Sequence, residues 1–332
     1  MDAGIDSGEA AGRAEHRYAC FGLDVHSEIP LPELAGMPPP PATAARPRVV
    51  IRTGTIPAEL TIVPGAGRAR AIGCDTFLID VKDTARYLVR GGAEIVVEPC
   101  AGGSALNLRL FLLGSAFGAL CHQRGFLPLH ANAVVVGGRA FAFAGRSGIG
   151  KSTLAAYFQT RGYQVLCDDV CVVSFDDEGR PMAWPGLPRL KLWRDAAETF
   201  GHDSRALERA IDGRDKYHVP LASTGDRGPY PLARIYLLRN VADGAPEAIE
   251  HLTAAPAVRA LMANTYRRGF VRKMDLLDRS FQQATAVAHH AAVFSAARHR
   301  GFDVFEREAE RLADHLRQPA DSVSGAARAL SA

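Results

Sequence analysis

The chain has 332 residues, of which 47% are hydrophobic and 23% charged, and its formal net charge is +3. These values are ordinary for a soluble globular protein with one large or two modest domains. So small a net charge gives no argument for a nucleic acid or a membrane as partner, and we expect neither. The N-terminus lacks the apolar core of a signal peptide, and the six cysteines lack C-x-x-C spacing. We therefore expect a cytoplasmic protein without a disulfide framework or a zinc site.

The first third of the chain is predicted to be rich in strands. Residues 1–16 are polar and are predicted to be disordered. Short apolar runs separated by turn residues then follow, a pattern typical of a small antiparallel sheet. The runs are Tyr18–Val25, Arg48–Arg52, Thr76–Asp80, Tyr87–Arg90 and Glu94–Glu98.

The periodicity becomes helical from Asn107 to Arg124. Its apolar part, Leu110–Cys121, is too short to span a bilayer, so we expect a buried helix. We place a domain boundary here, between a small β-rich domain (17–105) and a larger domain (106–317).

A glycine-rich motif, Gly145-x-x-x-x-Gly150-Lys151-Ser152, follows next in the chain. The alternating run Val134–Ala144 predicts a strand before it, and Ser152–Phe158 predicts a helix after it. Glycines let backbone N–H groups surround phosphate oxygens, and a helix N-terminus favours an anion. Lys151 can reach the β- and γ-phosphates, while the Ser152 hydroxyl can bind Mg²⁺. The motif predicts a site for a nucleoside triphosphate and Mg²⁺ that comprises Gly145, Arg146, Ser147, Gly148, Ile149, Gly150, Lys151, Ser152 and Thr153.

Two adjacent carboxylates, Asp168 and Asp169, lie in the run 164–173, which predicts the next strand. A strand–helix–strand unit of this length places the two strands parallel and close together, so the carboxylates are expected beside the motif. Adjacent side chains on a strand point to opposite faces, so the two differ in role. One of the two could hold Mg²⁺, and the other could accept a proton from an attacking hydroxyl. The alternative for each is a surface charge at a strand end.

Further candidates are a histidine and four basic residues. His130 precedes the strand that leads into the motif; its alternative role is a structural hydrogen bond. The basic residues lie in two clusters within loops that contain proline or glycine, where they can neutralise charge on a transferred phosphoryl group. They are Arg189, Lys191, Arg214 and Lys216. From spacing alone, a solvated surface is their commoner role.

The C-terminal part is predicted to be mainly helical. A strand at 233–238 precedes a helix at 257–268, a helical region to about 290 and a last helix at 303–316. Residues 318–332 are predicted to form a flexible tail.

Together these residues resemble the catalytic domain of the HPr kinase/phosphorylase superfamily. The matching segments are Leu129–Ala131, Gly145–Ser152 and Arg161–Val170, and the match is specific across about 125–175. The resemblance implies an α/β P-loop fold of the type shared with phosphoenolpyruvate carboxykinase. It also implies that Asp169 is the general base and that His130 orients the site, which leaves Asp168 to bind Mg²⁺ with Ser152.

The chain departs from that family in two places. Pro185–Trp193 lies where the family has a signature that supplies a metal-binding glutamate, so neither phosphorylase activity nor a hexamer is implied, and a homo-oligomer of another kind stays open. The opening Gly22–Glu33 is more similar to HPr-kinase-like proteins of bacterial peptide-biosynthesis clusters, some of which phosphorylate a serine of a lasso-peptide precursor.

The resulting expectation is an ATP- and Mg²⁺-dependent serine kinase that acts on a small protein or precursor peptide. The alternatives are a nucleotide-sensing module that binds a peptide without transfer, and a small-molecule kinase.

Overall fold

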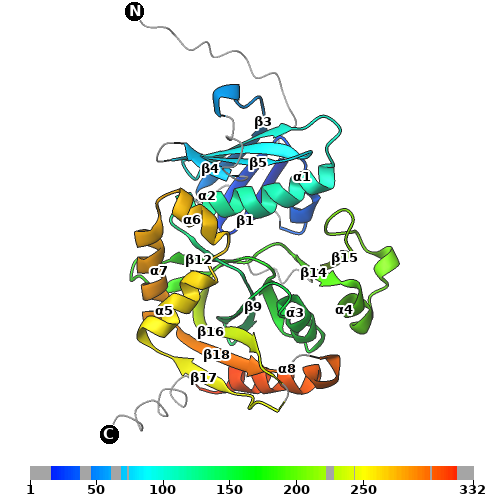
Figure 1. Ribbon diagram of the computed structural model, residues 1–332, viewed down its shortest axis with the longest axis vertical. Helices are drawn as coiled ribbons and strands as arrows, with labels where there is room; N and C mark the ends of the chain where they lie inside the picture. Colours follow the sequence, from blue (N-terminus) through cyan, green and yellow to red (C-terminus); the bar gives the residue numbers. More distant parts are fainter. Residues whose placement is uncertain are drawn as a thin grey trace, which may run out of the picture.

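The computed structural model describes residues 16–37, 46–60, 69–72, 75–221, 228–242, 244–299 and 301–319. Within these residues the chain forms a seven-stranded sheet, a nine-stranded sheet and a two-stranded ribbon, with helices packed against them (Figure 1). The predicted mixed α/β class is confirmed. The segments predicted to be disordered or flexible, 1–16 and 318–332, lie almost entirely outside the described residues.

The seven-stranded sheet has the order β1-β2-β3-β7-β6-β5-β4. Its strands are β1 (His16–Cys20), β2 (Leu23–Ser27), β3 (Arg48–Thr53), β4 (Ala69–Ile72), β5 (Thr76–Val81), β6 (Ala85–Arg90) and β7 (Glu94–Pro99). The prediction of an antiparallel sheet was wrong, because β3 runs parallel to both β2 and β7. The predicted strand 18–25 is a hairpin that turns at Phe21 and Gly22, both with positive φ. Alternation of apolar residues gives neither strand direction nor such a turn.

One continuous helical segment covers this sheet. It consists of α1 (Ala105–Phe111), a π-helical turn (Leu112–Ala116) and α2 (Phe117–Gln123). Its buried side chains share one core with the strands, and the Tyr87 hydroxyl donates to the carbonyl of Leu108 at 2.8 Å. By length and composition alone the 19-residue segment Ala105–Gln123 could cross a membrane, but 56% of its apolar window is buried in the protein. The helix that follows the predicted domain boundary thus packs on the sheet that precedes it.

The nine-stranded sheet has the order β11-β9-β10-β16-β13-β12-β8, with β18 beside β16 and β17 beside β18. The strands are β8 (Leu127–Leu129), β9 (Ala131–Val136), β10 (Arg139–Ala144), β11 (Gln164–Cys167), β12 (Cys171–Phe175), β13 (Pro181–Ala183), β16 (Tyr230–Asn240), β17 (Ile249–Leu252) and β18 (Ala292–Arg298).

Two predictions for this sheet need correction. The single strand expected at 134–144 is the antiparallel hairpin β9–β10, which turns at Gly137 and Gly138. The strand expected at 164–173 breaks between β11 and β12. Both β10 and β11 pair antiparallel with β9, so they are parallel as predicted but are separated by one strand.

Helices cover both faces of the nine-stranded sheet. Along β10, Phe141 and Phe143 join a core with α3 (Lys151–Thr160) and α8 (Phe302–Arg317). Its alanines face the opposite way, toward α5 (Ala254–Ala263) and α7 (Leu277–His290). This alternation is what a strand buried on both faces requires.

The remaining elements are short. They are the ribbon of β14 (Arg189–Trp193) and β15 (Lys216–Pro220), helices α4 (Arg194–Thr199) and α6 (Arg268–Lys273), and the 3₁₀ turns η1 (Pro32–Leu34), η2 (Ala58–Leu60) and η4 (Ser204–Ala206).

The stacked aromatic core gives a stability prediction. Phe143 is fully buried, with ring centroids 5.3 Å from Phe158 and 5.2 Å from Tyr236. We expect Phe143→Ala to lower the free energy of unfolding by about 3–5 kcal/mol, because it removes a large buried ring and leaves a cavity. Urea denaturation measures the change. The matched control is Phe281→Ala, whose side chain is 54% exposed; equal losses in the two variants would contradict the prediction.

Candidate active site

The glycine-rich motif forms a loop between the end of β10 and the start of α3. We call residues Gly145–Ser152 the phosphate loop. Two of its glycines are required by geometry, because Gly145 and Gly150 have φ of +151° and +93°. A Cβ at Gly145 would lie 2.9 Å from the carbonyl oxygen of Leu238, and one at Gly150 would lie 2.8 Å from the Arg298 guanidinium. Only glycine fits a backbone packed this closely.

The Lys151 side chain folds back onto the phosphate loop. Its Nζ donates to the carbonyl oxygens of Gly145 at 2.8 Å and Arg146 at 3.2 Å. Burial lowers the pKa of Lys151 to about 8, although Asp169 and Asp168 act in the opposite direction. To bind an anion, the ammonium group would therefore have to give up its hydrogen bonds to these two carbonyl oxygens.

Two side chains from elsewhere hold the backbone of the loop. Asn132 on β9 donates to the carbonyl of Lys151, and Arg298 at the end of β18 donates to the carbonyl of Ile149. Arg298 is buried, which lowers its pKa to about 10 and leaves it charged at neutral pH. The loop is thus fixed from the sheet side as well as by its own turns.

Asp168 follows the last residue of β11 and faces the start of α3. Its Oδ1 accepts a hydrogen bond from the Ser152 hydroxyl at 2.9 Å, and its Oδ2 accepts one from the backbone N–H of Lys191 at 2.9 Å. Burial, followed by the neighbouring Asp169, raises the pKa of this carboxyl. A cation at this point would relieve the cost of burying the charge.

The residues fit a magnesium ion that arrives with a nucleotide. A carboxylate and a hydroxyl are hard oxygen donors of the kind that Mg²⁺ binds, together with water and phosphate oxygens. Among the described residues no group of three or more His, Cys, Asp or Glu side chains could enclose a metal. Ser152 and Asp168 together would hold such an ion.

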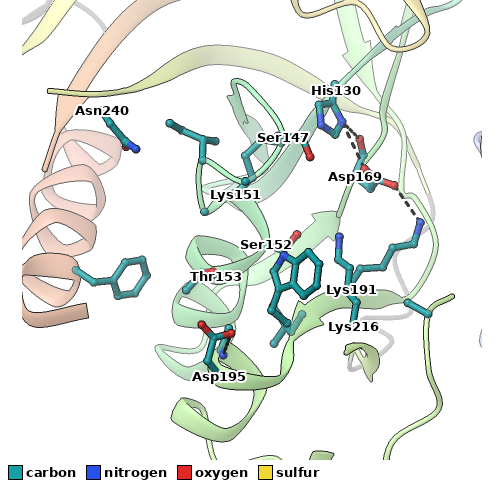
Figure 2. A pocket seen from close by; sticks show the side chains of 18 of the residues that line it. His130, Ser147, Lys151, Ser152, Thr153, Asp169, Lys191, Asp195, Lys216 and Asn240 are labelled. Atoms are coloured by element: carbon teal, nitrogen blue, oxygen red, sulfur yellow. Dashed lines mark hydrogen bonds and ion pairs between the residues drawn. The ribbon is translucent and has the colours of Figure 1, made fainter. Parts of the chain in front are cut away.

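Asp169 adopts a left-handed backbone conformation with φ of 71°. Its Oδ2 accepts a hydrogen bond from Lys191 Nζ at 3.0 Å, and its Oδ1 lies 3.4 Å from His130 Nδ1 (Figure 2). Burial alone would raise the pKa of Asp169, but the charge of Lys191, followed by the nearby His130, holds it well below its usual range. The group is a carboxylate throughout the physiological pH range.

His130 orients the turn that contains Asp169. Its Nδ1 lies 2.9 Å from the backbone carbonyl oxygen of Asp169, which can only accept, so Nδ1 carries the proton. Burial and the nearby Lys151 lower the pKa of the ring, which is therefore neutral at pH 7. Its own backbone N–H donates to the carbonyl of Asn264 at 2.8 Å.

These groups surround a cavity of about 690 Å³. Most of the residues selected from the sequence line it: His130, Ser147, Gly148, Ile149, Gly150, Lys151, Ser152, Thr153, Asp169, Lys191, Arg214 and Lys216. Gly145, Arg146 and Asp168 do not line it but contact residues that do.

Arg189 is placed elsewhere. It is buried, donates to His218 Nδ1 at 3.1 Å and lies 3.8 Å from the Glu33 carboxylate, outside the cavity. Arg189 therefore does not line this cavity, unlike the other three basic residues that were selected with it from the sequence.

Sequence reasoning missed several residues of the cavity wall. Trp193, Asp195, Asn240, Arg298 and Phe305 all line it. Arg298 was missed because β18 was not predicted: its run of small apolar residues directly follows a long helix. The position of Arg298 follows instead from the direction of the strands. Because β16 and β18 run parallel to β10, their C-terminal residues reach the same edge of the sheet as the phosphate loop.

Comparisons with known proteins leave the function open. No family model matches the chain, and no curated protein matches its sequence. Among solved structures, the chain is similar to the structure of the Hpr(Ser) kinase/phosphatase from Coxiella burnetii, with 12% identity and a TM-score of 0.30, over 57% of this chain and 97% of that chain. A similarity with so low a TM-score gives no argument about function. Any functional argument therefore depends on the residues that line the cavity.

The lowered pKa of Lys151 gives a pH prediction. With a pKa of about 8, the free protein loses the ammonium charge as the pH rises through that value. A bound triphosphate favours the charged form, so its affinity should fall by up to about tenfold per pH unit above about pH 8, with proton uptake on binding. Isothermal titration calorimetry with ATP and Mg²⁺ from about pH 7.5 to about pH 9.5 measures both quantities.

Lys151→Met is the control for this experiment. It should bind ATP more weakly, without the alkaline decrease. An equally steep decrease in that variant would assign the titration to another group.

Proposed function

We propose that this protein is a cytoplasmic ATP- and Mg²⁺-dependent kinase that transfers the γ-phosphoryl group to a serine hydroxyl of a small protein or precursor peptide. One observation carries the proposal: the ionised carboxylate of Asp169 lines the same cavity as Lys151 and Ser152 of the phosphate loop. A carboxylate held beside a triphosphate site is the arrangement that transfer to a hydroxyl needs.

The arrangement of the cavity supports one orientation of the nucleotide. Lys151 and Ser152 lie between Asn240 on one side and His130 and Asp169 on the other (Figure 2). The γ-phosphate would point toward Asp169, and the nucleoside toward Asn240. Phe305 also lines the cavity and offers an aromatic surface to a base.

The binding groups follow from the geometry. The amides of the phosphate loop and Lys151 would hold the β- and γ-phosphates, after Lys151 leaves its carbonyl partners. Ser152 and Asp168 would hold Mg²⁺, which neutralises charge on the phosphate oxygens when bound. Lys191, Arg214 and Lys216 add positive charge at the cavity wall for the phosphoryl group or for the acceptor.

In the transfer step the serine oxygen attacks the γ-phosphorus, and the bond from that phosphorus to the oxygen bridging to the β-phosphate breaks. The hydroxyl proton passes to the Asp169 carboxylate, which leaves ADP and a phosphoserine. A depressed pKa is compatible with this role, because the transition state of phosphoryl transfer is loose and places more demand on orientation than on basicity. Lys191 and His130 supply that orientation.

The peptide acceptor comes from the sequence resemblance and is the least constrained element. Incubation with ATP, Mg²⁺ and candidate precursor peptides, read by intact mass, tests it directly. Addition of one phosphoryl group to a serine supports the kinase. ATP binding without any phosphorylated peptide would favour the nucleotide-sensing alternative, and phosphorylation of small hydroxyl compounds alone would favour a small-molecule kinase.

The two carboxylates should respond differently to neutralisation. We expect Asp169→Asn to lower kcat by about 10²- to 10⁴-fold while ATP affinity changes little, because it removes the proton acceptor and leaves the phosphate loop intact. Asp168→Asn should instead raise the Mg²⁺ concentration needed for half-maximal activity. Steady-state kinetics over a Mg²⁺ series measure both.

Asp314→Asn makes the same change at an exposed position on α8, where the side chain is 71% exposed, and should behave as wild type. Transfer by Asp169→Asn at the wild-type rate would remove Asp169 from its assigned role.

A further inference from the structure

The β14–β15 ribbon brings Lys191, Trp193 and Lys216 to the cavity, but it belongs to neither large sheet. Its strands pair antiparallel over five positions, from Arg189↔Pro220 to Trp193↔Lys216. Leu190 and Leu192 pack against α3 in a small apolar core. Because side chains alternate along a strand, Arg189 and Lys191 share the opposite face.

That opposite face is held by a buried charge from the N-terminal part of the chain. Glu33, on η1, has a side chain that is 2% exposed. Its Oε1 accepts a hydrogen bond from Arg109 Nε on α1 at 2.8 Å and lies 3.8 Å from Arg189 NH1. Arg189 also donates to His218 on β15 at 3.1 Å, so the ion pair with Glu33 is linked to both strands of the ribbon.

The contact continues along α1. The Ser104 hydroxyl, at the N-terminus of α1, donates to Asp212 at 2.6 Å, and Arg109 NH2 lies 3.9 Å from Glu208. Both acidic residues lie in the segment between α4 and β15, which Figure 1 shows next to α1. The N-terminal part therefore contacts the ribbon and its connection through several polar groups.

Buried ion pairs contribute little to net stability, because desolvation offsets the attraction between the charges. They do restrict the relative positions of their two partners, because separating the partners leaves a buried charge without compensation. Lys191 is two residues beyond Arg189 on the same face, and its backbone N–H and Nζ contact Asp168 and Asp169. A shift of β14 at Arg189 would therefore also displace Lys191 from its contacts with Asp168 and Asp169.

We infer that Glu33 is a positioning residue for phosphoryl transfer: through Arg189 it fixes β14 so that Lys191 meets Asp169. The inference rests on the proposed kinase activity, and it makes Glu33 one of the residues that this activity requires. Glu33 itself touches neither the cavity nor the phosphate loop. Its removal should alter the transfer step and spare nucleotide binding.

The kinetic test compares Glu33→Gln with Glu98→Gln. The control removes the same kind of charge from an ion pair within the seven-stranded sheet, where Glu98 lies 2.9 Å from Arg86. Since displacements of about 1 Å can cost about 10²-fold in rate, we expect Glu33→Gln to lower kcat by about 10- to 100-fold with KM for ATP within about twofold of wild type. Glu98→Gln should leave both constants unchanged, and Glu33→Asp, which keeps the charge, should recover part of kcat.

A fluorescence test detects the position of β14 without any activity. The chain has two tryptophans, so a Trp184→Phe background leaves Trp193, the last residue of β14, as sole reporter. In that background Glu33→Gln should shift the Trp193 emission and change its quenching by acrylamide, and Glu98→Gln should do neither. If the wild-type protein transfers no phosphate, that result overturns the kinase proposal but not the positional effect of Glu33, which the fluorescence test still measures.

Two outcomes would overturn the inference. One is a Glu33→Gln variant with wild-type kcat and wild-type Trp193 quenching. The other is a loss of kcat accompanied by an equal loss of ATP affinity, which indicates general damage. If Glu33→Gln does not fold, by circular dichroism and thermal melting, Arg189→Lys keeps the buried charge while changing the contact, and the same two readouts apply.

Discussion

The turn at Asp168 and Asp169 is the constraint on which the cavity depends. A strand continuing past Cys167 would send these two side chains to opposite faces of the sheet. The chain instead breaks there, and Asp169 takes a left-handed backbone conformation. Both carboxylates then meet Lys191, one through its backbone N–H and the other through its ammonium group. Each carboxylate also has a second partner of its own, Ser152 for Asp168 and His130 for Asp169, so their electrostatic environments differ.

Local patterns predicted the parts of the site that are continuous in sequence. The phosphate loop was recognisable because strand, glycines, lysine and helix follow one another within about twenty residues. The Asp pair was recognisable because it lies in the strand predicted directly after the helix that follows the loop. Lys191 and Lys216 were selected for charge alone, and the structure brings both to the cavity. Arg189, selected on the same ground, lies in the buried cluster with Glu33.

The failures concern relations between distant segments. Apolar alternation identified β3 and β5 but could not give the parallel pairing of β3, and it merged β9 with β10 across a two-glycine turn. Glu33 and Arg298 carried no local signal, since the residue that each contacts lies far along the chain. Their roles come from burial and pairing, which depend on how the sheets and helices pack. The identity of the acceptor depends on a partner molecule, so neither sequence patterns nor the chain's own geometry define it.

The cluster around Glu33 also has a consequence for the order of folding. Glu33 and Arg189 are 156 positions apart (189 − 33), whereas Arg189 and His218 are neighbours on one ribbon. Contacts across long sequence separations carry a larger loop-closure entropy and tend to form late. The two sheets can gain most of their apolar burial without this cluster, because their cores are largely distinct, although Val172 on β12 packs in the core of the seven-stranded sheet. The sheets can thus be compact before β14 takes its final position, and the proposed phosphoryl transfer would become possible only once this long-range contact has formed.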